Sequence, residues 1–177
     1  MYETLSKEKI YNGPIFDLAH YQIALPNGKH GRRDVIEHKG AAVIVAVADD
    51  GRLVMVRQHR VGASAMLLEL PAGKLDLGEE PEKCALRELA EETGYAATKI
   101  RPLLGVFPVA AWCTEKHHIF LAEDLKPGEP NPDVDEFVEV ELHSVSDLLR
   151  MIERGEIVDA KTIVGVLYYS SFVMTKM

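Results

Sequence analysis

Short runs of hydrophobic residues, bounded by turn residues, predict strands over much of the chain. The near-continuous apolar run AAVIVAVA, residues 41–48, predicts a strand that is buried on both faces. The turn residues at 49–51 predict that the next run, RLVMVRQHR at 52–60, folds back and pairs with it. Further strands are predicted near residues 100–107, 116–122 and 134–142.

Apolar residues at helical spacing predict three helices. Residues 81–93 carry an apolar face between Pro81, which suits a first helical turn, and Gly94, which suits a C-terminal cap. Two more helices are predicted near residues 144–155 and 160–174. Strands followed by flanking helices predict the α/β class, as an α/β/α sandwich around a mixed sheet.

The first part of the chain has a different pattern. Residues 15–25 and 32–38 predict two short strands joined by a turn at 26–28, which is a β-hairpin. A sheet of this size has little core of its own, so it must pack on another surface. We therefore expect an N-terminal antiparallel β subdomain at residues 1–38, which forms a dimer, and a main domain at residues 39–177.

Composition excludes several classes of protein. The chain has 177 residues, of which 47% are hydrophobic, and this favours a folded domain over a disordered segment. A net charge of -8 argues against a nucleic-acid surface, which needs clustered Lys and Arg. Two distant cysteines, Cys84 and Cys113, favour a reducing compartment, so we expect the cytoplasm. The apolar run 163–174 is too short to span a bilayer, so no membrane is expected.

The second face of the helix at 81–93 is acidic. Glu88, Glu91 and Glu92 recur at spacings of three and four residues, so their carboxylates share a face. This face is either solvated or part of a cleft. In a cleft, like charges about 5 Å apart at an effective dielectric of about 20 repel by about 3 kcal/mol per pair. A bound Mg²⁺, which prefers carboxylate oxygens together with water and phosphate, would offset that repulsion.

The spacing around this helix is specific. It reads Gly73, five residues, Glu79, seven residues, Arg87-Glu88-Leu89, one residue, Glu91-Glu92, one residue and Gly94. This pattern resembles the Nudix box at every defined position but the last, where Tyr95 replaces the usual aliphatic residue and is interpreted as packing. The resemblance implies a hydrolase that splits a nucleoside diphosphate linked to a further group.

The resemblance to the Nudix family also implies a role for each residue of the box. Mg²⁺, or Mn²⁺ in its place, is expected to be held by oxygen ligands, namely Glu88 and Glu92 directly, Glu91 as a further or shared ligand with a part in catalysis, Glu79 through water or helix support, and the carbonyl of Ala72. Arg87 is expected to serve catalysis by orienting the glutamates through salt bridges.

Segments outside the box narrow the resemblance to the ADP-ribose pyrophosphatase branch. They are VIEHKGAAVIVAV, VRQHR, LLELPAG and HIFLAEDL. The resemblance implies that the substrate is ADP-ribose, cut to AMP and ribose 5-phosphate. It also implies a homodimer formed by exchange of the N-terminal sheets.

The same branch implies several substrate contacts. Arg60 is expected near the diphosphate or ribose, and Arg33 is expected to reach it too; an exposed surface arginine is the alternative for each. Phe16 is the nearest match to an aromatic residue that helps hold the base, with core burial as the alternative. Trp112 either stacks on a base or sugar or belongs to a core or interface. Glu69 matches an acidic position that supports the metal site.

Two departures from the branch leave details open. A Ser-Pro-Gly segment that many members carry is replaced here in the stretch 109–115, VAAWCTE. The general base is expected in a late acidic loop, where we choose Glu136, with Asp133 or Asp135 as substitutes. The box is another source of the base.

Other functions remain open at this point. The nearest rival is hydrolysis of another nucleoside diphosphate sugar such as GDP-mannose. A module of the same fold that senses a nucleotide without turnover is a second rival, although no box glutamate is missing. A zinc site at His117 and His118 is disfavoured, because adjacent residues on a strand point to opposite faces.

Overall fold

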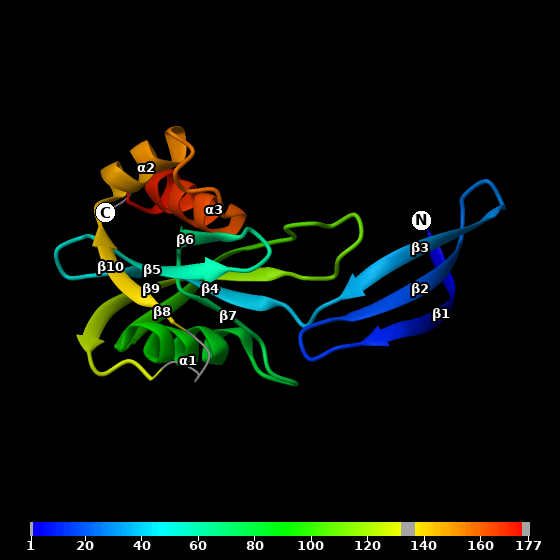
Figure 1. Ribbon diagram of the computed structural model, residues 1–177, viewed down its shortest axis with the longest axis horizontal. Coiled ribbons are helices and arrows are strands. Elements are labelled where there is room, and N and C mark those ends of the chain that lie inside the picture. Colours follow the sequence, from blue (N-terminus) through cyan, green and yellow to red (C-terminus); the bar gives the residue numbers. More distant parts are fainter. Residues whose placement is uncertain (1, 132–136, 175–177) are drawn as a thin grey trace. The chain divides into compact units, whose positions relative to one another are not determined.

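The computed structural model describes residues 2–131 and 137–174, and the chain divides into two compact units, each with its own sheet (Figure 1). They are an N-terminal unit, residues 1–40 and 107–116, and a main unit, residues 41–106 and 117–177. That residues 1–38 and 39–177 are separate domains stays a prediction.

The main unit is built on a mixed sheet in which the strand order is β10-β5-β4-β9-β8. Neighbouring strands are antiparallel except for the parallel pair β4 and β9, while β6 pairs with β5 and β7 with β4. The predicted mixed sheet is confirmed. The strands are β4 (Ala41–Val47), β5 (Leu53–Arg60), β6 (Ala65–Glu69), β7 (Ala72–Lys74), β8 (Tyr95–Val106), β9 (His117–Pro127) and β10 (Glu139–His143).

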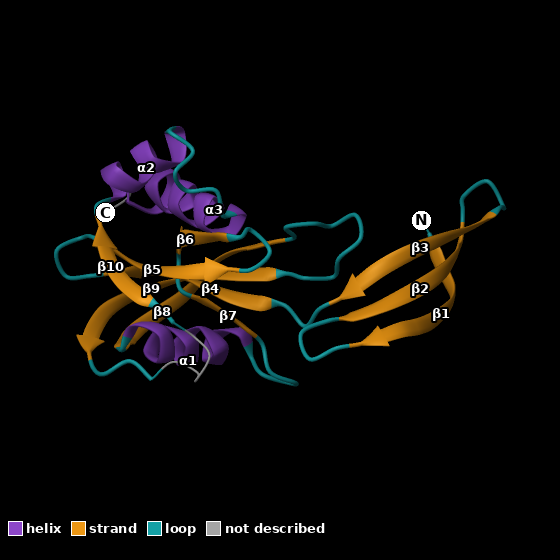
Figure 2. Cartoon of the chain, in the orientation of Figure 1, coloured by secondary structure: helices purple, strands orange, loops and turns teal. Residues whose placement is uncertain are grey.

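Helices cover both faces of this sheet (Figure 2), so the predicted α/β/α sandwich is confirmed. On one face lies α1 (Pro81–Thr93), and on the other lie α2 (Val145–Glu153) and α3 (Ala160–Tyr168). Strand β4 is apolar at successive positions because it serves both cores. Val43 and Val45 pack toward α2 and α3, whereas Ala42 and Ile44 pack toward α1.

The N-terminal unit is a three-stranded antiparallel sheet of β1 (Glu3–Asn12), β2 (Asp17–Ala24) and β3 (His30–Glu37). The hairpin of β2 and β3 was predicted from its turn. Strand β1 was not, because all of its residues are exposed and its polar side chains give no apolar pattern. Residues 107–116 join this unit through Ile36, whose N–H donates to the Trp112 carbonyl at 2.8 Å.

Some element bounds differ from the sequence-based expectations. Strand β8 begins at Tyr95, earlier than expected, because its first residues pair with the end of β9. The predicted helix at 160–174 divides into α3 and a π-helical turn, Tyr169–Val173. Of the predicted strand at 134–142, only residues 137–142 are described, and β10 forms at Glu139–His143. No helix in the described parts of the chain is long and apolar enough to cross a membrane.

Core packing by α2 gives a direct test of this architecture. Leu148 is fully buried between α2 and the sheet, whereas Leu167 on α3 is 42% exposed. We expect Leu148→Ala to lower the free energy of unfolding by about 2–5 kcal/mol, through lost transfer energy and a residual cavity. Leu167→Ala is the matched control and should lower it by less than half as much. Urea denaturation of the variants measures both, and equal losses would contradict the packing described.

Candidate active site

Helix α1 has a fixed register because both of its ends are chemically determined. Pro81 occupies the first turn, where its missing N–H costs nothing. Gly94 ends the helix with a φ of 74°, and its N–H donates to the Ala90 carbonyl at 2.9 Å. A Cβ atom at Gly94 would lie 2.7 Å from the Gly128 carbonyl oxygen, so a larger residue does not fit.

Two of the box glutamates lie on the buried side of α1. Glu88 is 9% exposed and Glu92 is 3% exposed, and both are adjacent in space to the core residue Leu89. The solvated-face alternative is therefore wrong for these two residues. Glu91 is more exposed, at 38% of its side chain. Buried carboxylates need hydrogen bonds or opposite charges to offset their lost hydration.

Strand β7, which precedes α1 in the chain, determines where these two carboxylates lie. A Cβ atom at Gly73 would lie 1.7 Å from the carboxyl carbon of Glu88, so any side chain there would displace that carboxylate. In the same strand, the Ala72 N–H donates to Oε2 of Glu92 at 3.0 Å. The glycine of the box is thus required by close approach of a carboxylate to the backbone.

Arg87 connects three of the glutamates. Its Nη1 donates to Oε1 of Glu88 at 2.7 Å and to Oε2 of Glu91 at 2.9 Å. Its Nε and Nη2 donate to the two oxygens of Glu79, each at 3.0 Å. Arg87 was predicted to orient the glutamates through salt bridges, and such a role requires these contacts with Glu79, Glu88 and Glu91.

These contacts shift the protonation equilibria of the site. Hydrogen bonds from Arg87 lower the pKa of Glu79 to about 2, and the same interaction raises the pKa of Arg87. Glu79 is therefore ionised throughout the neutral range. Burial raises the pKa of the nearby Cys84 thiol to about 12, so Cys84 is a neutral core residue and not a nucleophile.

A second group of charges lies where β5 and β6 pair. Arg60 donates from Nε and Nη2 to the two carboxylate oxygens of Glu69, at 2.8 and 2.7 Å. This hydrogen bonding raises the pKa of Arg60, and the charges of Glu69, Glu92 and Asp159 raise it further against the opposing effect of burial. Arg60 is therefore within electrostatic reach of the acidic face, and it is not an ordinary surface arginine.

The groups around α1 suit a hard divalent cation, because the donors are carboxylate oxygens. The space left by Gly73 is filled by the Glu88 carboxylate and not by an apolar group, which also fits a cation site. Within the described residues, no three acidic, histidine or cysteine side chains already converge as a metal-binding set. Arg87 instead binds Glu79, Glu88 and Glu91, and a single guanidinium cannot neutralise all the carboxylates of the box.

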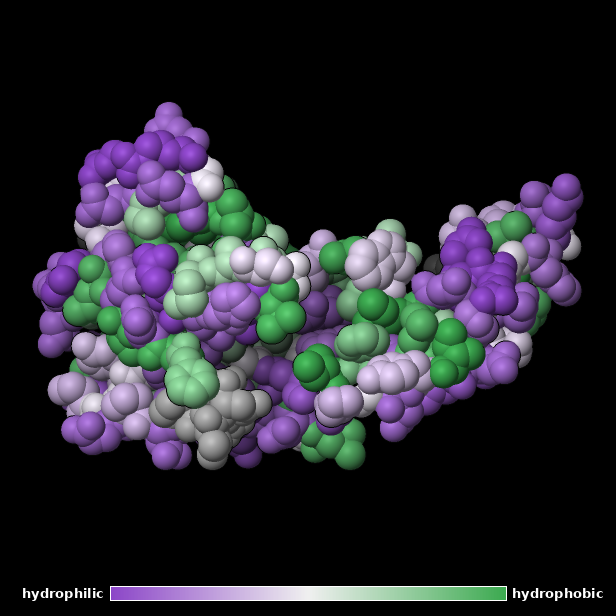
Figure 3. Space-filling view, in the orientation of Figure 1, coloured by the Kyte–Doolittle hydropathy of each residue, from purple (hydrophilic) through white to green (hydrophobic). Residues whose placement is uncertain are grey.

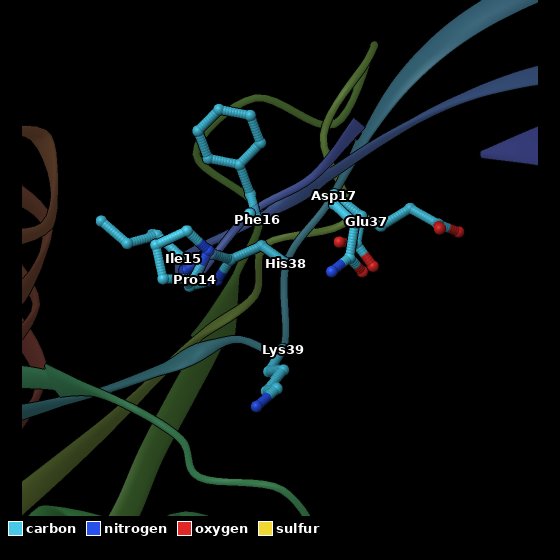
Figure 4. Close-up of a pocket in the computed structure, with 9 residues that line it drawn as sticks. Pro14, Ile15, Phe16, Asp17, Glu37, His38 and Lys39 are labelled. Atoms are coloured by element: carbon cyan, nitrogen blue, oxygen red, sulfur yellow. The ribbon is translucent and has the colours of Figure 1, made fainter. Parts of the chain in front are cut away.

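Phe16 belongs to the N-terminal unit and lines a hollow of about 370 Å³ (Figure 4). The wall is formed by the turn between β1 and β2, residues 12–17, and by residues 37–39. Phe16 is 39% exposed, and its ring centroid lies 5.7 Å from that of Tyr11. Core burial, one alternative for Phe16, is therefore wrong.

The remaining predicted residues fall in different places. Arg33 is exposed, and its Nη1 donates to the Arg32 carbonyl at 2.8 Å. Trp112 is 51% exposed, so a core position is wrong for its side chain. Glu136, Asp133 and Asp135 lie outside the described residues, so the assignment of the general base stays a prediction.

Lys161 contacts this site although the sequence analysis did not single it out. Its Nζ lies on the Glu69 carboxylate and 3.0 Å from Asp159. No local pattern marks it, because a lysine in the first turn of an amphipathic helix is ordinarily solvated.

Three relatives match most of the chain and carry different names. An ADP-ribose pyrophosphatase from Bacillus subtilis is 42% identical over 94% of this chain and 91% of its own length. A methanol dehydrogenase activator from Bacillus methanolicus is 34% identical over the same shares. A GDP-mannose pyrophosphatase from Citrobacter koseri is 34% identical over 95% of each chain.

A solved structure and a family model complete the comparison. The crystal structure of an ADP compounds hydrolase superposes with a TM-score of 0.85 over 99% of this chain and 95% of its own, at 22% identity, which supports the fold. The NUDIX domain model matches residues 37–164, which include β7, α1 and all four glutamates of the box. This chain is therefore a member of the Nudix family and a hydrolase of pyrophosphate bonds.

Proposed function

We propose that this Nudix hydrolase splits the pyrophosphate of ADP-ribose into AMP and ribose 5-phosphate. The observation that carries the proposal is the pair of buried carboxylates: Glu88 approaches Gly73 closely and Glu92 accepts the Ala72 N–H, while the charge of Glu92 also acts on Arg60. Buried carboxylates repel an anionic diphosphate, so a diphosphate can bind beside them only together with a cation. The Bacillus subtilis relative named for ADP-ribose supports this choice of substrate.

Enzymes of this family depend on a divalent metal, and we propose Mg²⁺, with Mn²⁺ as a substitute. The residues that would hold it are Glu88 and Glu92, with Glu91, Glu79 and the Ala72 carbonyl in supporting positions. A bound Mg²⁺ neutralises the diphosphate and lowers the pKa of a coordinated water. Because Arg87 binds both oxygens of Glu79 but one oxygen each of Glu88 and Glu91, support of Arg87 is the better role for Glu79.

Residues outside the box divide the remaining tasks. Arg60 binds the diphosphate, since its guanidinium is partly exposed and is influenced by the charge of Glu92 on the acidic face. Phe16 stacks on the base, which its exposed ring and the adjacent hollow would accommodate. Arg33 is exposed enough to contact the diphosphate or ribose, and Trp112 is exposed enough to stack on a base or sugar. Glu136 is the proposed general base.

Release of products gives the primary test. With Mg²⁺ present, the purified protein should convert ADP-ribose to AMP and ribose 5-phosphate, and EDTA should abolish the reaction because the carboxylates then repel the substrate. Chromatography of the products measures both effects. GDP-mannose is the comparison substrate, since one relative is named for it. Much faster hydrolysis of GDP-mannose would overturn ADP-ribose as substrate while leaving the pyrophosphatase activity.

The approach of Glu88 to Gly73 gives a second test. Gly73→Ala should displace the Glu88 carboxylate, which ends a flexible side chain, so the protein should fold normally yet lose at least about tenfold in kcat/KM. Gly62→Ala is the matched control, because a Cβ atom there meets no atom within 4 Å. Steady-state assays and melting temperatures of both variants are compared with the parent. Full activity of Gly73→Ala would contradict the role of Glu88.

We also propose that the chain is a homodimer formed through the N-terminal sheet. Leu5, Ile10 and Tyr11 on β1 are 46%, 44% and 50% exposed, and Figure 3 shows hydrophobic residues beside hydrophilic ones on the surface of the N-terminal unit. Exposed apolar side chains on an edge strand are a feature of interaction surfaces. Nucleic acid is not an expected partner, and the cytoplasm stays the expected location.

Sedimentation tests the dimer. The parent should sediment at twice the mass of one chain, and Leu5→Glu combined with Ile10→Glu should sediment as a single chain, because two buried charges would destabilise the interface. Leu77→Glu is the control, since Leu77 is 89% exposed in the main unit. A double variant that stays dimeric would place the interface elsewhere.

A further inference from the structure

Glu69 is more deeply buried than Glu88 or Glu92, with 1% of its surface exposed, and it contacts two cations. Arg60 binds both of its oxygens, and Lys161 donates from Nζ to Oε2, which it shares with Nη2 of Arg60. A buried carboxylate that lost its counter-charge would be strongly destabilising. Glu69, however, carries a single negative charge, so the two positive charges of Arg60 and Lys161 are more than its neutralisation requires.

Asp159 explains the second cation. Lys161 Nζ lies 3.0 Å from Oδ2 of Asp159, so Arg60, Lys161, Glu69 and Asp159 form a group with no net charge. Burial alone would raise the pKa of Asp159, but the charge of Lys161 and hydrogen bonds from Thr162 and Lys161 outweigh it and leave that pKa lowered. Asp159 is therefore ionised, and Lys161 neutralises two carboxylates at once.

The two cations differ in their access to solvent. The side chain of Lys161 is 11% exposed, whereas that of Arg60 is 41% exposed. Arg60 uses Nε and Nη2 for Glu69, so Nη1 points away from that carboxylate. Arg60 can therefore contact an anionic ligand, while Lys161 stays enclosed with its carboxylates.

The first turn of α3 is also bonded to the short loop between β6 and β7, which leads into the strand of the box glycine. Strand β6 and α3 lie side by side (Figure 1), and the Leu70 N–H donates to Oγ1 of Thr162 at 2.9 Å. A Cβ atom at Gly165 would lie 2.4 Å from Cδ1 of Leu70, so α3 packs closely on this loop. Lys161 is therefore held at a fixed position relative to Glu69 and to Ala72.

We propose that Lys161 is a positioning residue for substrate binding: by pairing with the buried Glu69 carboxylate, it allows Arg60 to bind the diphosphate without leaving Glu69 alone. The inference rests on the function proposed above, in which Arg60 contacts the diphosphate. Without Lys161, the charge of Glu69 is balanced by Arg60 alone, and the diphosphate must compete with a buried carboxylate for the same guanidinium. Substrate binding then weakens, while the reacting groups on α1 keep their arrangement.

The test separates substrate binding from turnover. Lys161→Met, which keeps the length of the side chain without its charge, should raise KM for ADP-ribose by about tenfold and change kcat by less than about threefold. Lys161→Arg should restore most of the parent KM. Lys99→Met is the matched control, because Lys99 forms an exposed ion pair with Asp124 and should leave KM unchanged.

Two further variants test whether Lys161 acts through the charge of Glu69. In a Glu69→Gln background, where no buried carboxylate competes for Arg60, Lys161→Met should cause no further rise in KM, whereas a purely structural role would add its own loss. Lys161→Met combined with Asp159→Asn removes one charge of each sign and keeps a good helix cap, so it should fold even if the single variant does not. This double variant should also show the raised KM.

Three results would overturn the inference: a parent KM in the charge-balanced double variant, additive losses in the Glu69→Gln background, or a fall in kcat with KM unchanged. If the parent prefers another nucleoside diphosphate sugar, the proposed substrate fails, and KM is measured with the preferred one. If no sugar nucleotide is hydrolysed, the proposed function fails, and the Kd of ADP with Mg²⁺, measured by calorimetry, replaces KM. ADP-ribose, other sugar nucleotides and ADP all contain a diphosphate. The effect of Lys161→Met on diphosphate binding can therefore be measured with any of them.

Discussion

Burial of carboxylates is the constraint on which the site and much of the main unit depend. An isolated buried carboxylate costs several kcal/mol, so its position is stable only where other elements supply charge or N–H groups. Those groups come from separate parts of the chain, and each fixes the element that carries it. They are Arg87 on α1, Arg60 on β5, Lys161 on α3 and the Ala72 N–H on β7. The acidic site thereby helps to hold both helical layers on the sheet.

The parts of the fold that could be predicted from sequence are those encoded locally. β4 is apolar at every position because both of its faces are covered, and α1 begins and ends at residues with strong positional preferences, Pro81 and Gly94. β1 could not be predicted in this way. Its extended form is stabilised by pairing with β2, and its own exposed residues carry no periodic apolar signal. Residues 107–116 are similar, because their pairing with Ile36 spans a long stretch of chain.

The same distinction applies to the site. Gly73, Arg87, Glu88 and Glu92 could be identified because their chemistry requires a fixed spacing around one turn and one helix. Lys161 is 92 residues from the carboxylate that it binds, and only the packing of α3 on β6 brings them together. Sequence spacing carries no information about such a contact. Because Glu69 is buried, it requires a counter-charge, and only the folded structure shows that Lys161 supplies part of it.

Arg87 holds three carboxylates of the box through contacts within the chain itself. Its Nε and Nη2 bind both oxygens of Glu79, which also accepts from the Asp76 N–H at 2.9 Å, while Nη1 serves Glu88 and Glu91. A cation that binds these last two carboxylates competes only with Nη1, because Glu79 retains the other end of the guanidinium. Arg87 would thus stay in place when a metal binds, and the carboxylates would keep a counter-charge with or without it. On the proposed metal role, removal of the metal should therefore affect catalysis far more than it affects the fold.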